Sequence, residues 1–104
     1  MKQVRVTVLK TDFYPDLVEE YGAEGLKPCP YFEVGQVFES NKHRKPADFP
    51  CDDAWNCLST NVFALSAGAD DFYEGRWLKP GSKVVINTCN DGLRPVAFKL
   101  EVID

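Results

Sequence analysis

Residues 84–103 read VVINTCNDGLRPVAFKLEVI, and this stretch decides the fold. Two runs rich in β-branched and aromatic residues flank an Asp-Gly pair, which is a strong signal for a hairpin turn. The second run alternates apolar and polar side chains, so one face of its strand should point into a core. Pro95 near its start is typical of the beginning of a strand or of an edge position. The sequence therefore predicts an antiparallel hairpin with strands at residues 84–89 and 94–103.

Two strands and a short helix are predicted upstream of this hairpin. Residues 3–10 alternate around three valines, which favours a half-buried strand. Residues 31–39 predict a second strand that is interrupted at Gly35. Between them, Pro15 suits the first position of a helix and Gly22 suits the position just past its end. That helix is short and would be marginal in isolation.

A longer helix is predicted from near Cys51 to Ala67, with Gly68 as its stop signal. Its apolar side chains fall within a sector of about 80°, the width expected of a core-facing stripe. The residues of this stripe are Trp55, Leu58, Val62 and Leu65. Cys51 projects on the same side as the stripe, whereas Cys57 lies towards the flank of the helix.

The order of elements predicts an α+β fold. A small mixed or antiparallel sheet, either open or curled into a barrel, would carry the long helix on one face. The chain has 104 residues, of which 44% are hydrophobic and 27% charged, values typical of a single globular domain. We therefore expect one domain over residues 1–104.

The charge balance argues against a protein that holds nucleic acid. The formal net charge is −4, whereas nucleic-acid binding normally requires a basic face. The only basic run, residues 42–45, is interpreted as a solvated loop, and His43 within it as a solvated side chain. We expect no nucleic-acid partner.

No export or membrane signal is visible in the chain. Residues 1–8 alternate instead of forming the apolar core of a signal peptide, and no apolar run approaches the ~20 residues that cross a bilayer. We therefore expect a cytoplasmic protein with no membrane partner. Because cytosolic thiols stay reduced, the four cysteines should be free thiols or metal ligands instead of disulfides.

Four segments of the chain resemble an uncharacterised family of short prokaryotic proteins that is found often in anaerobes. They read VTVLK at 6–10, PCPYFEVGQ at 28–36, CDDAW at 51–55 and CNDGLRPVAFKLE at 89–101. The resemblance covers nearly the whole chain and brings no activity with it. What it implies is positional, since Cys29, Cys51 and Cys89 match cysteines of the family pattern and Cys57 does not.

Cys29, Cys51 and Cys89 are candidate metal ligands at the ends of predicted elements. Thiolates are soft ligands that suit zinc or another soft metal. The spacing lacks the Cys-x-x-Cys pairs of strong zinc signatures. A shared site would therefore be assembled from a loop, a helix start and a strand end. Its fourth ligand would be Cys57, His43, an aspartate or water.

Two alternatives use the same cysteines. Cys51 at a helix N-terminus could be a nucleophile, because backbone N–H groups stabilise a thiolate there. Asp52 and Asp53 oppose this, and are themselves interpreted as helix-start charges. The cysteines could instead pack as small apolar residues. The sequence thus leaves open a domain that binds a metal or thiol-reactive ligand, a thiol-dependent enzyme and a protein-interaction module, and with them the partner and any homo-oligomer.

The hairpin turn is a second candidate site. Turn N–H groups and a nearby guanidinium can hold an anion, so Arg94, Asn90 and Asp91 form a candidate anion site. The alternative is a hairpin turn with a solvated arginine, because Asn, Asp and Gly are residues that turns themselves require.

Overall fold

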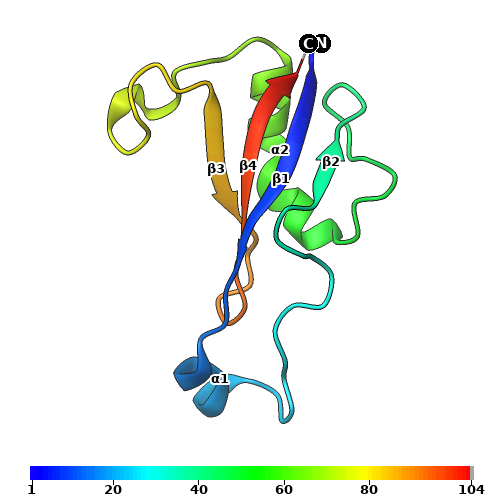
Figure 1. The fold of residues 1–104 in the computed structure, drawn as a ribbon, viewed down its shortest axis with the longest axis vertical. Coiled ribbons are helices and arrows are strands. Elements are labelled where there is room, and N and C mark those ends of the chain that lie inside the picture. The colour runs from blue at the N-terminus through cyan, green and yellow to red at the C-terminus, as the bar shows by residue number, and fades with distance from the viewer. Residues whose placement is uncertain (104) are drawn as a thin grey trace.

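The computed structural model describes residues 1–103, and its centre is an open antiparallel sheet of four strands in the order β2-β1-β4-β3 (Figure 1). The strands are β1 (Gln3–Thr11), β2 (Val37–Glu39), β3 (Val84–Thr88) and β4 (Val96–Ile103). The predicted α+β class is confirmed. The sheet does not close into a barrel, so the open alternative is the one that the molecule adopts.

The predicted C-terminal strand pair is confirmed. β3 pairs antiparallel with β4, with Val85 opposite Leu100 and Thr88 opposite Ala97. The two strands are joined by residues 89–95, a connection longer than a tight two-residue turn. Pro95 stands just before β4, as predicted for a strand start. The edge alternative was wrong, because β4 lies between β1 and β3.

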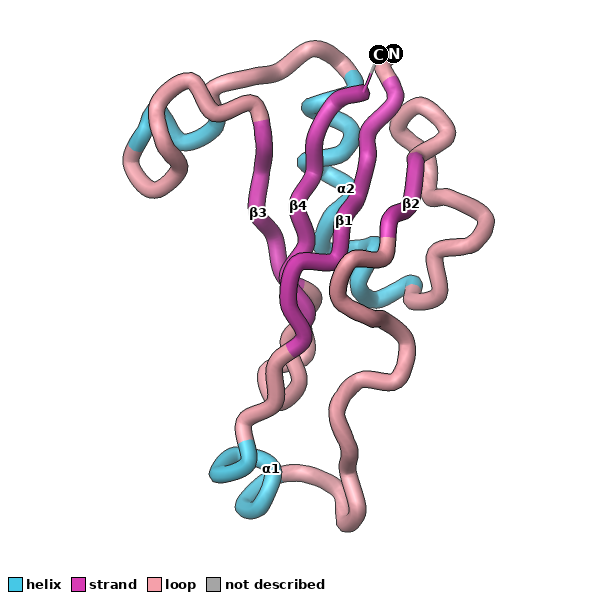
Figure 2. The backbone as a smooth tube through the Cα atoms, in the orientation of Figure 1, coloured by secondary structure: helices cyan, strands magenta, loops and turns pink. Residues whose placement is uncertain are grey.

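Strand β1 is the longest, and it bends. Its pairing with β4 shifts register between Val8 and Lys10, which is the signature of a β-bulge at Leu9. Beyond the bulge, β1 stays paired with β4 to Thr11 and then leads towards α1 (Pro15–Tyr21), which lies at the far end of the molecule (Figure 2). None of the seven residues described in α1 is buried.

Helix α2 (Asp52–Ser66) lies behind the sheet and covers one face of it (Figure 1). The four residues of the predicted stripe are all buried, so the predicted helix and its core face are confirmed. They meet a cluster of phenylalanines on the sheet and in the preceding loops. Its ring centroids are separated by 5.1 Å for Phe32 and Phe98 and by 5.0 Å for Phe38 and Phe49.

Two details differ from the sequence-based expectations. The second strand begins only at Val37, because Gly35 takes a positive φ of 91° and the N–H of Gln36 donates to the carbonyl of Glu33 in a turn. His43 is half-buried instead of solvated, because its ring packs edge-on against Phe63 with centroids 5.3 Å apart.

The connection between α2 and β3 contains the short 3₁₀ segment η1 (Phe72–Gly75). Phe72 packs against the core, while Trp77 is 70% exposed and stacks on Tyr73. Across residues 1–103, no helix combines the length and the apolar character that crossing a membrane requires.

Leu58→Ala should lower the free energy of unfolding by roughly 2–5 kcal/mol, because Leu58 is fully buried between α2 and the sheet and its loss leaves a cavity. Urea unfolding followed by circular dichroism measures this change. The matched control is Asn56→Ala on the exposed face of the same helix, which should change stability by less than about 0.5 kcal/mol. Equal losses for both variants would contradict the placement of α2.

Candidate thiol cavity

Cys29, Cys51 and Cys89 line one cavity of about 130 Å³ beside the start of α2. They come from three separate segments: the loop before β2, the residue before α2 and the loop after β3. All four cysteines of the chain are free, and the described lining of the cavity does not include Cys57. Three of the four cysteines thus border a common hollow, while a functional cluster of these cysteines stays a prediction.

Cys51 is the N-cap of α2. Its backbone is extended (φ −139°, ψ 114°), and its Sγ accepts a hydrogen bond from the N–H of Ala54 at 3.4 Å. Ser, Thr, Asp and Asn are the usual residues at this position, because their side-chain oxygen satisfies a free N–H of the first turn. Here the Cys51 sulfur replaces that oxygen as the hydrogen-bond acceptor, which fixes the direction of the Cys51 side chain.

Cys89 is fixed by the start of β4. Its backbone N–H donates to the carbonyl of Val96 at 3.1 Å, and its Sγ accepts from the N–H of Val96 at 3.3 Å. These two contacts close the loop of residues 89–95. The Cys89 sulfur therefore lies at the point where the C-terminal strand pair opens.

Cys29 reaches the cavity from a loop. It stands between Pro28 and Pro30, which restrict its backbone, and it packs half-buried against the core. Two contacts hold the neighbouring residues. Phe32 is buried in the aromatic cluster, and the Arg94 guanidinium donates from one terminal nitrogen to the carbonyl of Lys27 at 3.3 Å.

Cys57 differs from the other three cysteines in its environment. Burial is the main cause that raises the pKa of its thiol, and the negative charges of Cys89, Asp53 and Cys51 raise it further. A raised pKa keeps Cys57 protonated at neutral pH. Since the thiolate is the reactive form, Cys57 should react more slowly than an unperturbed thiol.

The hydrogen-bond donors of the predicted anion site are engaged by the carboxylate of Asp91. One carboxylate oxygen of Asp91 accepts from the N–H groups of Leu93 and Arg94, both at 2.9 Å, and the other accepts from Arg94 Nε at 2.9 Å. Arg94, Asn90 and Asp91 all line the thiol cavity. The anion that this turn holds is therefore its own Asp91, and the same donors are not free for an external one.

These contacts also set the ionisation of Asp91. Burial raises the pKa of its carboxyl group, but the two backbone hydrogen bonds and the Arg94 guanidinium lower it by more. The net result is a pKa below the ordinary value of 3.8. Asp91 is therefore charged at neutral pH.

The three cysteines do not form a ready coordination shell. Within residues 1–103, no three or more histidine, cysteine, aspartate or glutamate side chains are grouped so that they could hold a metal ion. The zinc or other soft-metal site predicted from Cys29, Cys51 and Cys89 thus stays a prediction without support from the geometry.

Sequence reasoning did not place the remaining residues of the cavity. They are Tyr31, Phe32, Asp53, Ala54 and Val96. Asp53 was interpreted only as a helix-start charge, yet it stands two residues after Cys51 and borders the same space. Its position could have been inferred from that spacing, whereas Tyr31 and Phe32 reach the cavity through a loop whose path the sequence does not specify.

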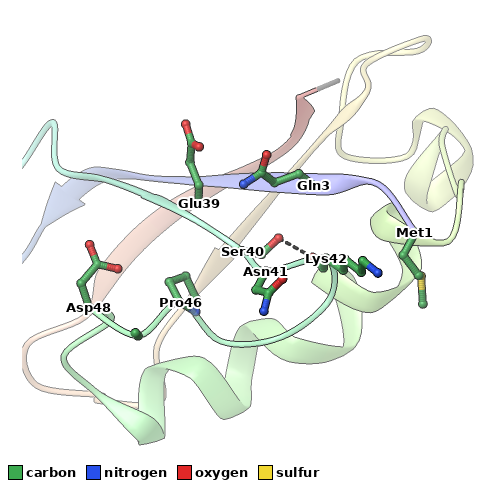
Figure 3. A pocket seen from close by; sticks show the side chains of 9 residues that line it. Met1, Gln3, Glu39, Ser40, Asn41, Lys42, Pro46 and Asp48 are labelled. Atoms are coloured by element: carbon green, nitrogen blue, oxygen red, sulfur yellow. Dashed lines mark hydrogen bonds between the residues drawn. The ribbon is translucent and has the colours of Figure 1, made fainter.

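Two wider hollows lack comparable chemistry. One, of about 460 Å³, lies between the start of β1 and residues 39–48 (Figure 3). Its Ser40 is buried and already engaged, since its hydroxyl accepts from the N–H of Val4 at 2.9 Å and donates to the carbonyl of Lys42. The other, of about 440 Å³, is an open groove on α2 lined by Trp55 and Phe63.

Asp91→Asn should lower the free energy of unfolding by about 1 kcal/mol near neutral pH, because the charged pair with Arg94 is lost while one acceptor oxygen remains. The folded-state pKa of Asp91 is depressed, so this stabilisation is complete above pH 3.8 and disappears as pH falls through the lowered value. Urea unfolding of both proteins from pH 7 to pH 2.5 tests this. A difference that grows on acidification would contradict the assignment, and the exposed Asp48→Asn is the control.

Comparison with known proteins adds no assignment. No protein-family model, no curated protein and no solved structure matches the chain. The family resemblance of the sequence therefore stays a prediction.

Proposed function

We propose that this protein binds a small thiol-reactive ligand through Cys29, Cys51 and Cys89. The observation that carries the proposal is their common cavity, which gathers three free thiols from positions up to 60 residues apart in the chain. A volume of about 130 Å³ accommodates only a few non-hydrogen atoms, so the ligand, or the part of it that enters, is small.

Packing alone does not account for these positions. The sealed core is made of valine, leucine, phenylalanine and alanine, together with Trp55. The cysteines are only half-buried and lie at the border of that core, against the cavity. A residue that merely fills volume is best placed where it is fully enclosed, because its contribution scales with the apolar surface removed from water.

Two of the three sulfur atoms accept backbone hydrogen bonds, from Ala54 to Cys51 and from Val96 to Cys89. These hydrogen bonds hold the two sulfur atoms in fixed positions at the cavity. Cys51 and Cys89 are therefore the expected points of attack on an electrophilic ligand. The same contacts would serve a thiol-dependent enzyme, which is the alternative function.

N-Ethylmaleimide tests whether the three thiols share one site. On a Cys57→Ser background, the first adduct at Cys29, Cys51 or Cys89 should fill the common space and slow the next addition about tenfold or more. Intact-mass spectrometry over time should show the singly modified protein accumulating, and peptide mapping should locate the adduct. Unfolding in urea should abolish the exclusion, because the thiols then no longer share a cavity.

The single variants Cys29→Ser, Cys51→Ser and Cys89→Ser sharpen this test, since each should still take up one adduct rapidly. Three independent additions at unrelated rates would refute a common site.

Elemental analysis of protein purified without air tests the metal alternative separately. A stoichiometric zinc or copper ion that is lost in all three variants would overturn the proposal in favour of the metal alternative.

A further inference from the structure

The charged side chains that line the thiol cavity carry more negative than positive charge. They are Asp53, Asp91 and Arg94. Asp91 and Arg94 neutralise each other through a contact of 2.9 Å between carboxylate and Nε. Within residues 1–103, no cation pairs with the third group, the exposed carboxylate of Asp53. At the start of α2, Lys45 pairs with the neighbouring Asp52, so that lysine is committed to another carboxylate.

Three backbone donors near the cavity that could attract an anion are also occupied. The N–H groups of Leu93 and Arg94 point to the Asp91 carboxylate. At the start of α2, the N–H of Ala54 points to the Cys51 sulfur. A ligand that brought its own negative charge would therefore face the Asp53 carboxylate without these compensating donors.

The charge of Asp53 acts on one thiol of this region, that of Cys57. Asp53, Cys51 and Cys89 are all among the groups whose negative charge raises the pKa of Cys57, after the larger effect of burial. Asp53 borders the cavity itself, in the first turn of the helix that Cys51 caps. The Asp53 carboxylate thus borders the same cavity as the three thiols.

From the unmatched Asp53 carboxylate and the occupied donors we infer that the ligand of the thiol cavity is uncharged or positively charged, and that the site discriminates against anionic thiol reagents. This inference rests on the proposed function and specifies its ligand class. It also reverses the sign of the ligand expected from the turn of residues 90–94.

Two methanethiosulfonates of equal reactivity type and opposite charge test this inference, one carrying a trimethylammonium group and the other a sulfonate group. In both reactions the thiolate sulfur attacks the sulfenyl sulfur. A protein–S–S–R disulfide forms, the S–SO₂ bond breaks, and methanesulfinate leaves with the bonding electron pair. The protein thiol is oxidised and the thiosulfonate is reduced, so no further oxidant is needed.

For each reagent, the rate constant of modification is measured on a Cys57→Ser background at about 0.15 M salt, and the rate constant for the cationic reagent is divided by that for the anionic one. The same ratio for the urea-unfolded protein serves as the reference, and dividing the folded ratio by it gives the normalised ratio. We expect this normalised ratio to exceed one. Asp53→Asn should lower it about threefold, which is the size of effect that one partly screened charge exerts over a few ångströms. Asp52→Asn removes the same charge one residue away, outside the cavity, and should leave it nearly unchanged.

A normalised ratio at or below one, or equal effects of Asp53→Asn and Asp52→Asn, would overturn the inference. These outcomes are separable from failure of the proposed function. If N-ethylmaleimide adds to the three thiols independently, the proposed shared site is refuted, even where each thiol prefers the cationic reagent. If the first adduct does slow the next addition but Asp53→Asn leaves the normalised ratio unchanged, the shared site is supported and only the inferred ligand class is wrong.

Discussion

The pairing of β4 on both of its edges is the constraint on which this molecule depends. β4 bonds to β1 along nearly its whole length and to β3 on the other side, and it buries Val96, Phe98 and Leu100 beneath α2. The same strand supplies the N–H of Val96 that fixes the Cys89 sulfur. Core and cavity therefore share one element, and a disturbance at the start of β4 would reach both.

Local sequence patterns predicted most of the fold, because each pattern depends only on residues that are close together in the chain. Alternation specified β1 and β4, and the spacing of Trp55 and Leu58 specified the buried face of α2. The errors have a different origin. His43 is half-buried only because Phe63, twenty residues later, covers it. The strand expected from residue 31 was lost to the turn at Gly35, where backbone geometry outweighs the alternation around it.

The cavity was predictable in part for the same reason. Cysteines at the ends of elements can be located from element boundaries, and the family resemblance separated Cys57 from the rest. The contribution of Asp53 and the internal use of the Asp91 carboxylate depend on side-chain contacts across the fold. Those contacts change the chemistry expected of the site, since they turn an apparent anion-binding turn into a neutral pair and leave a carboxylate among thiols.

The position of Cys51 has a consequence for the helix that it caps. Its sulfur accepts the N–H of Ala54, so a ligand bonded to that sulfur would change the direction and strength of this acceptor at the start of α2. Capture of the proposed ligand would therefore be thermodynamically linked to the integrity of the first helical turn. Occupancy of a space of about 130 Å³ would be transmitted to a fifteen-residue helix that spans the back of the sheet.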